Sequence, residues 1–306
     1  MKVACIGAVH IDAKARLVGE AHGGTSNPAR VVRTPGGVAG NVARNLGRLG
    51  LPVSLFSIIG NDAEGRALLG ELDAASVDTS GVLRSAGPPT ATYLAVLNRD
   101  GRLIVAAADM EIYDALDAAW AGRVGRALAA FDAWVMDANL PAVAIAALIR
   151  HAGDAVVLAD PVSVPKAGRL QAALSRLDVL FPDRAEAVTL AGPAGGAEMS
   201  VAAAAAEIRR RGARCVVVSL GSKGAYLDDG SGGRQVAPLP ARKVVDVTGA
   251  GDAQIAGYVY GLSRPGGGHH PLDWGMAAAA LTVETIDSVR ADLTPALLRD
   301  RLEGRS

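Results

Sequence analysis

The run Ala155-Val156-Val157-Leu158-Ala159-Asp160 is apolar until its final aspartate and lies between helical patterns at residues 141–152 and 166–176. A strand that is apolar on both faces and flanked by helices is typical of a parallel sheet covered on both sides. Further strands are predicted at 3–7, 53–59, 133–137, 179–181 and 215–220, and further helices at 65–75, 115–130, 201–211, 252–262, 272–286 and 294–302. We therefore expect one three-layer α/β/α unit with a mostly parallel sheet over residues 1–306, and ligands beyond the carboxyl ends of its strands.

Two stretches, at roughly 10–35 and 89–109, interrupt this alternation. In the second, Asp100-Gly101 separates two apolar runs, which is a hairpin signal. A hairpin does not fit inside a parallel sheet. We interpret the two stretches as a small β-lid over the sheet edge, although a decorative surface hairpin would give the same pattern.

Charge is balanced, with 31 Lys plus Arg and 31 Asp plus Glu, so nothing draws the chain to nucleic acid or to an anionic membrane. Cys5 and Cys215 lie in strand-like runs, which favours buried thiols over a disulfide or a metal site. The N-terminus reads as a strand without a signal peptide, and the Ala-rich runs are too short to span a bilayer. We expect a cytoplasmic protein.

The strongest chemical signal is Asp246-Val247-Thr248-Gly249-Ala250-Gly251-Asp252-Ala253, which opens a predicted helix. The glycines allow a tight turn and close approach of a ligand to the backbone. The free N–H groups of the helix start form an anion hole for a phosphoryl group. An acidic residue beside such a site calls for a reason, and Asp252 as general base supplies one.

A plainer interpretation treats Asp252 as a helix cap and the glycines as an ordinary turn. Other chemistries lack their signatures, since the chain contains neither a P-loop sequence nor the glycine fingerprint of dinucleotide-binding folds after its first strand. Another cluster, Pro35-Gly36-Gly37-Val38-Ala39-Gly40-Asn41, also opens a helix. In chain order we call it the first Gly cluster and the run at 246–253 the second. By itself the first Gly cluster indicates a turn and a cap, although Asn41 could bind a small polar ligand.

Together the two clusters resemble the signatures of the ribokinase-like (PfkB) carbohydrate kinases, and the likeness extends along nearly the whole chain. The resemblance implies ATP-dependent phosphorylation of a sugar or nucleoside hydroxyl, with Asp252 as the base. Gly249, Ala250 and Gly251 would form the anion hole. The acceptor would be held by Asp12, Gly36, Gly37 and Asn41.

The resemblance also implies cofactor contacts. Glu186 would order Mg²⁺ through water, and Asp246 would help to form a monovalent-cation site, for which K⁺ is the candidate. The ATP site would comprise Asp183, Ser219, Gly221 and Gly224. Three positions depart from the family pattern or from its subgroups: Asp183 stands in place of Asn, Gln254 in place of Phe, and Gly40 in place of Arg.

Narrower features, including Thr25-Ser26-Asn27-Pro28 and the run at 160–167, resemble the pseudouridine kinases of this family. Lid residues Ser26, Asn27 and Thr92 could pair with a uracil-like base, or could equally shape turns and strand edges. A kinase for ribose, adenosine, cytidine or a ketose, and a nucleoside-binding protein without catalysis, remain alternatives. An exposed lid edge also predicts a homodimer through the lid.

Overall fold

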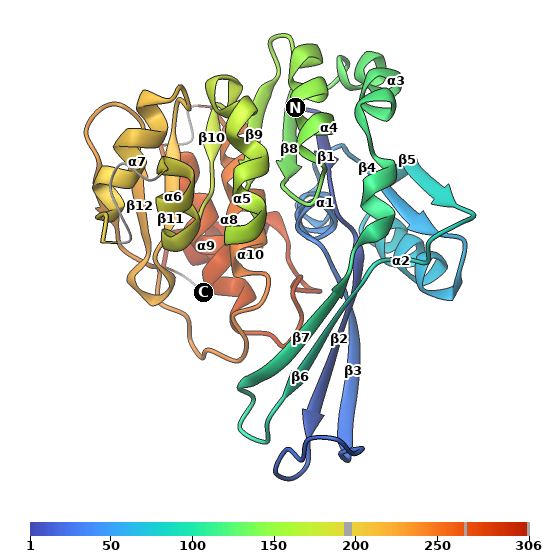
Figure 1. Cartoon of the computed structure of the whole chain (residues 1–306). Helices are drawn as coiled ribbons and strands as arrows, with labels where there is room; N and C mark the ends of the chain where they lie inside the picture. The colour runs from blue at the N-terminus through green and yellow to red at the C-terminus, as the bar shows by residue number, and fades with distance from the viewer. Residues whose placement is uncertain (193–197, 266–267, 305–306) are drawn as a thin grey trace.

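The computed structural model describes residues 1–192, 198–265 and 268–304. Its main sheet has nine strands in the order β13-β12-β11-β10-β9-β8-β1-β4-β5 (Figure 1). Their bounds are β1 Val3–Ile6, β4 Val53–Gly60, β5 Asp78–Ser85, β8 Ala133–Asp137, β9 Val156–Asp160, β10 Val179–Leu180, β11 Val216–Ser219, β12 Ala225–Asp228 and β13 Arg234–Val236. The strands from β11 to β5 pair in parallel, and β12 and β13 add an antiparallel edge.

Helices cover both faces of this sheet (Figure 1). One face packs on α3 Ala118–Leu128, α4 Ala142–Leu148, α6 Arg184–Ala191 and α7 Val201–Arg210. The other packs on α1 Val38–Arg48, α2 Ala63–Ala74, α8 Ala250–Leu262 and α9 Pro271–Thr282, with α10 Pro295–Leu302 against α9. Residues of β1 alternate between the two cores, Ala4 and Ile6 in one and Cys5 in the other. The predicted three-layer α/β/α fold is therefore confirmed.

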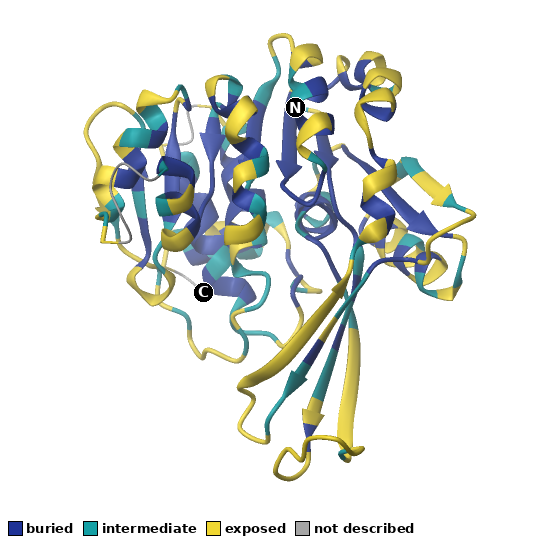
Figure 2. Ribbon diagram, in the orientation of Figure 1, coloured by how far each residue is buried: buried dark blue, intermediate teal, exposed yellow. Residues whose placement is uncertain are grey.

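A second sheet of four strands protrudes from this body (Figure 1). It consists of β3 Ala29–Gly36, β2 His10–Leu17, β6 Thr92–Leu97 and β7 Leu103–Asp109 in that order. The outer pairs are antiparallel hairpins and the central β2–β6 pair is parallel. Figure 2 shows long exposed stretches on β3 and β7. We call this sheet the lid.

Some elements differ from those predicted. Residues 166–176 form no continuous α-helix, because α5 Val164–Ala167 is followed by a 3₁₀ segment, Gly168–Arg176, that starts at a glycine. Helix α6, which the sequence did not predict, is defined by a capping box between Asp183 and Glu186. Edge strands β5, β12 and β13 were missed because they are short or half-exposed and lack an apolar run. No helix within the described ranges is long and apolar enough to cross a bilayer.

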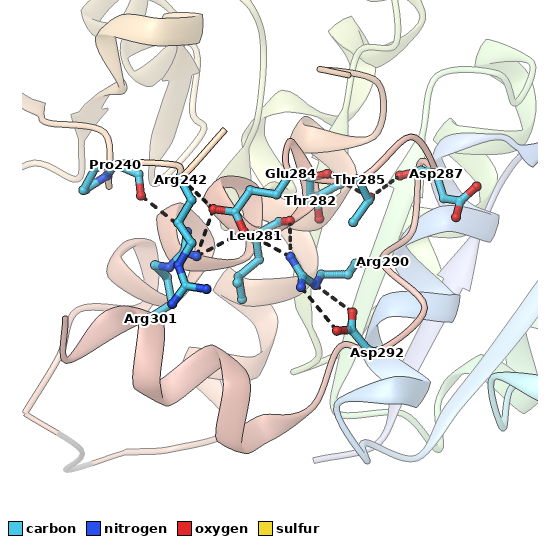
Figure 3. A network of polar contacts seen from close by, with 10 residues as sticks. All are labelled: Pro240, Arg242, Leu281, Thr282, Glu284, Thr285, Asp287, Arg290, Asp292 and Arg301. Atoms are coloured by element: carbon cyan, nitrogen blue, oxygen red, sulfur yellow. Dashed lines mark hydrogen bonds and ion pairs between the residues drawn. The ribbon is translucent and has the colours of Figure 1, made fainter. Parts of the chain in front are cut away.

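A polar network ties the segment after α9 to α10 (Figure 3). The carboxylate of Glu284 accepts hydrogen bonds from the backbone N–H of Arg242 at 2.7 Å and from the Arg301 guanidinium at 2.9 Å. The side chains of Glu284 and Arg301 are 11% and 4% exposed. Arg290 also donates to Glu284, at 3.2 Å. A carboxylate in such surroundings offsets two buried or nearly buried cations.

We expect Glu284→Gln to lower the free energy of unfolding by about 2 kcal/mol or more, because it removes the negative charge that faces two largely buried guanidinium groups. Urea denaturation measures this change. The matched control is Glu207→Gln on α7, which removes an exposed ion pair with Arg210 and should alter stability little. Equal effects of the two substitutions would contradict a structural role for the network.

Candidate active site

Asp137, the last residue of β8, connects three backbone segments at the floor of the site. Its carboxylate accepts hydrogen bonds from the backbone N–H groups of Ala8 at 2.9 Å, Ala39 at 3.0 Å and Asn139 at 2.9 Å. These three groups belong to the segment after β1, the start of α1 and the loop after β8. A fully buried carboxylate therefore fixes the first Gly cluster above the carboxyl ends of two neighbouring strands.

The glycines of that cluster are required by close approaches. Gly37 has φ 91°, and a Cβ there would lie 2.4 Å from the carbonyl oxygen of Ala8. A Cβ on Gly36 would lie 2.4 Å from a carboxylate oxygen of Asp12. The cluster thus packs directly against β1 and β2, and it presents Asn41 from the first turn of α1.

Asp252 lies on the first turn of α8 and is half-buried. The N-cap of α8 is Gly249, so the interpretation of Asp252 as the helix cap is wrong. Its Oδ2 instead accepts a hydrogen bond from Nδ2 of Asn41 at 2.7 Å. Burial raises the pKa of the Asp252 carboxyl to about 7, although the hydrogen bond from Asn41 lowers it. The carboxyl can therefore take up and release a proton near neutral pH.

Strand register decides which lid residues share a face with Asp12. Cross-strand partners point to the same side of a sheet. Asp12 pairs with Tyr93, whereas Thr92 pairs with Ile11 and so points to the opposite face. Thr92 therefore lies on the face opposite to Asp12, and Tyr93 lies on the same face as Asp12. His10 Nε2 lies 3.2 Å from Oδ1 of Asp12.

Lys14, two residues beyond Asp12 on the same face of β2, was not predicted as a site residue. Its ammonium lies 3.0 Å from Oγ1 of Thr248 and 3.5 Å from Oδ2 of Asp246. The lid thus contacts the second Gly cluster directly. The alternation in His10-Ile11-Asp12-Ala13-Lys14 could have indicated that Lys14 and Asp12 share a face.

Ser26 and Asn27 lie in the loop that joins β2 to β3, at the outer tip of the lid (Figure 1). Asn27 uses its amide within that loop, donating to the carbonyl oxygens of His22 and Thr25. The end of β2 is about 17 Å along the strand from Asp12, given the usual rise per residue. Within one chain, the structure does not bring these two residues to Asp252.

A pocket of about 510 Å³ lies beside the N-terminus of α8. Its lining contains Ser219, Gly221, Gly224, Ala250 and Gly251, all predicted from the sequence. Apolar side chains supply most of the remaining wall, among them Pro238, Leu239, Val244, Val247, Met276 and Val283. Gln254 also lines it, with Nε2 3.1 Å from the sulfur of Met276. An apolar slot that ends at a helix N-terminus suits a planar base carrying phosphates.

Asp183 and Glu186 lie next to this pocket, because Asp183 forms a β-bridge with Ser219. Both carboxylates are used in the capping box, where Asp183 accepts from the N–H of Glu186 at 2.8 Å and Glu186 from that of Asp183 at 2.7 Å. Burial raises the pKa of the Glu186 carboxyl to about 6. Their second oxygens remain the groups that a hydrated cation could use.

Known proteins resemble this chain in sequence and in fold. The profile of the pfkB family carbohydrate kinases matches residues 1–293. The pseudouridine kinase of Escherichia coli (strain K12) is 34% identical over 255 residues, which cover 83% of this chain and 82% of that protein. The solved structure of a carbohydrate kinase from Agrobacterium tumefaciens is 32% identical with a TM-score of 0.86, covering 99% of this chain and 97% of that chain. An Arabidopsis thaliana ribokinase complexed with ribose and ATP shares the fold, with a TM-score of 0.84 at 22% identity, over 99% of this chain and 98% of that chain.

The two glycines of the second cluster should respond differently to alanine. Gly249 has φ 79°, and a Cβ there would lie 2.1 Å from the carbonyl oxygen of Ser288, so Gly249→Ala should lower the thermal unfolding temperature clearly. Gly251 has no neighbour within 4 Å of its Cβ position, but it lines the pocket. Gly251→Ala should keep the stability and weaken ATP binding, as measured by calorimetry. Similar stability losses in both variants would contradict this geometry.

Proposed function

Because the chain belongs to the pfkB family of carbohydrate kinases, we propose that it transfers the γ-phosphoryl group of ATP to the 5′-hydroxyl of a nucleoside, with pseudouridine as the acceptor. The family and the relatives establish the coarser activity, an ATP-using phosphotransferase whose acceptor is an alcohol group of a sugar or nucleoside. The observation that carries the mechanism is the hydrogen bond from Asn41 to Asp252, which places this carboxylate next to the acceptor-side cluster, while the adjacent Gly251 lines the pocket beside α8.

In this mechanism Asp252 is the general base. Its ionised carboxylate accepts the proton of the 5′-hydroxyl while that oxygen forms a bond to the γ-phosphorus and the bond to the β,γ-bridging oxygen of ATP breaks. Backbone N–H groups of Gly249, Ala250 and Gly251, at the start of the 13-residue helix α8, would stabilise the negative charge of the transferred group. Supporting this role, the glycine conformation at Gly249 directs the loop into the helix start.

Asp12, Gly36, Gly37 and Asn41 are proposed to hold the ribose. Asp12 and Asn41 offer an acceptor and a donor, and the two glycines let the diol approach the backbone. For the base, Lys166 and Asn139 lie beyond the carboxyl ends of β9 and β8, with the ammonium 2.6 Å from Oδ1 of the amide. Donors of this kind suit the carbonyl groups of a uracil-like base.

The chemistry of the donors fits Mg²⁺ better than K⁺. Glu186 could hold Mg²⁺ through water, since this ion is usually bound by one or two carboxylates together with substrate phosphates, whose charge it neutralises. Asp246, the proposed K⁺ ligand, already accepts the N–H and O–H of Thr248, at 2.8 Å and 2.7 Å, and faces the Lys14 ammonium. The side chain of Asp246 therefore does not fit a further cation, and we assign K⁺ no step.

Asp252→Asn should lower turnover by roughly a hundredfold or more, the usual scale for the loss of a positioned base. The amide matches the carboxyl in shape, so the circular dichroism spectrum and the ATP affinity should be retained. A coupled ADP-release assay measures turnover. Near-normal turnover in a correctly folded variant would remove Asp252 from this role.

The acceptor is tested by ATP consumption with magnesium, comparing pseudouridine, uridine, adenosine, cytidine and ribose. We expect pseudouridine to have the highest kcat/KM, because its base offers two carbonyl acceptors and an additional N–H donor compared with uridine. A different winning acceptor would contradict the substrate assignment while leaving the kinase activity intact. If none is phosphorylated, a nucleoside-binding role without catalysis gains support.

We further propose that two copies pair through the outer face of the lid. Val31, Ala15, Val96 and Val105 form one row across the four strands, on the face opposite to Lys14. The side chains of Val31 and Val105 are each 58% exposed. An apolar row on an exposed sheet is suited to a second, identical lid.

This pairing predicts a particle of twice the chain mass of 31.0 kDa in light scattering at micromolar concentration. Val105→Asp should shift the particle towards the monomer, because it places a charge in the apolar row. Val143→Asp is the matched control, since Val143 is 61% exposed but lies on α4. A monomeric unmodified protein would contradict the proposal.

A further inference from the structure

We propose that Arg44 is a positioning residue for the catalytic base, acting through Asn41: its guanidinium fixes the Asn41 amide so that the amide NH₂ donates to Asp252. The inference rests on the proposed role of Asp252 as general base. It concerns a residue outside both Gly clusters, on the second turn of α1.

Arg44 is 6% exposed, which is unusual for an arginine and calls for polar partners. Its Nη2 donates to Oδ1 of Asn41 at 2.7 Å and to the carbonyl oxygen of Pro35 at 3.2 Å. Pro35 is the first residue of the first Gly cluster and Asn41 is its last. Arg44 therefore contacts the first and the last residue of the segment that carries the proposed acceptor-binding groups.

The orientation of the Asn41 amide follows from these contacts. A guanidinium has N–H donors and no acceptor, so the amide oxygen has to face Arg44. The NH₂ group then points the other way, and it lies 2.7 Å from Oδ2 of Asp252. A donor in this place favours the ionised carboxylate, which is the form that acts as a base. Without Arg44, the amide could rotate and turn its oxygen towards Asp252.

The charged groups around Asp252 and around Arg44 also indicate that Arg44 favours the ionised form of Asp252. Asp252 faces Asp137 from β8 and Asp12 from β2, which disfavour its ionisation, and Arg44 from α1, which favours it; Asp160 from β9 is a further neighbouring carboxyl group. Arg44 in turn faces Glu71 from α2, Arg48 from α1 and Asp287 from the segment after α9. Burial lowers the pKa of the Arg44 guanidinium to about 10, so it stays protonated at neutral pH. Arg44 is thus the cation that faces a base otherwise surrounded by carboxylates.

The test compares pH profiles of turnover with the best acceptor for the unmodified enzyme and for Arg44→Met, Arg44→Lys and Arg48→Met. Because a base works when ionised, log kcat should fall below about pH 7 in the unmodified enzyme. Arg44→Met should shift the fall in log kcat to higher pH by about one unit. Turnover should then be about tenfold lower at pH 6 and little changed at pH 9. Methionine is chosen because its flexible, unbranched side chain fills the space of the arginine stem while it removes the hydrogen-bond donors and the charge.

Arg44→Lys keeps the charge and should show a smaller shift than Arg44→Met. Arg48→Met is the matched control: Arg48 lies one turn further along α1 and contacts the carbonyl oxygen of Ala291, so its loss should leave the fall in log kcat at the same pH. A fall in turnover that is equal at all pH values, or identical shifts for the Arg44 and Arg48 variants, would overturn the proposal.

A second readout needs no turnover. In protein labelled with ¹³C at the aspartate carboxyl carbons, with Asp252→Asn to assign the signal, the Asp252 resonance should titrate at higher pH in Arg44→Met than in the unmodified protein. An unchanged titration would contradict the inference about Arg44 even if the enzyme is active. Conversely, an enzyme that phosphorylates no acceptor but shows the shifted titration would overturn the proposed function and leave the inference about Arg44 standing.

Discussion

The hydrogen bond between Asn41 and Asp252 joins the two halves of the site. The residues are 211 positions apart in the sequence, and the bond crosses from α1 to α8 on one side of the main sheet. It places the Asp252 carboxylate in half-buried surroundings, where burial disfavours the ionised form and the amide donor favours it. The glycines of the two clusters bring the starts of α1 and α8 close together, and Asp137 holds the start of α1 against the sheet.

Buried acidic groups gather at this end of the sheet. Asp137 satisfies its charge with backbone N–H groups and so remains a structural anchor, whereas Asp252 has one amide donor and a cation held at a distance. Asp160, at the end of β9, has a pKa well above its usual range because of burial and the neighbouring carboxylates Asp252 and Glu186. Asp252 and Asp160 each accept one hydrogen bond, from Asn41 and from the N–H of Val162, and burial is the main cause of the raised pKa at both positions.

Much of the fold and of the site follows from the sequence, because the decisive signals are local. Apolar strands, the glycine clusters and the capping of α8 depend on residues close together in the chain, and the prediction of Asp252, Asn41 and the pocket glycines drew on them. Contacts across the chain were not predictable in this way. Lys14 reaches residues more than 200 positions away, and the place of Tyr93 on the face of Asp12 was not predicted because the register between β2 and β6 is set by tertiary pairing. The acidic pair in Asp183-Arg184-Ala185-Glu186 indicated a cofactor site, while the structure shows it also starting a helix.

The path of β2 has a mechanical consequence. Two residues separate the first bend after β1 at Gly7 from the start of β2, and the strand then carries Asp12 and Lys14 on one face before it runs out into the lid. β2 is one continuous strand from His10 to Leu17, so Asp12 and Lys14 keep a fixed position relative to each other. A rotation of β2 relative to the main sheet would therefore displace the carboxylate of Asp12 and the ammonium of Lys14 together.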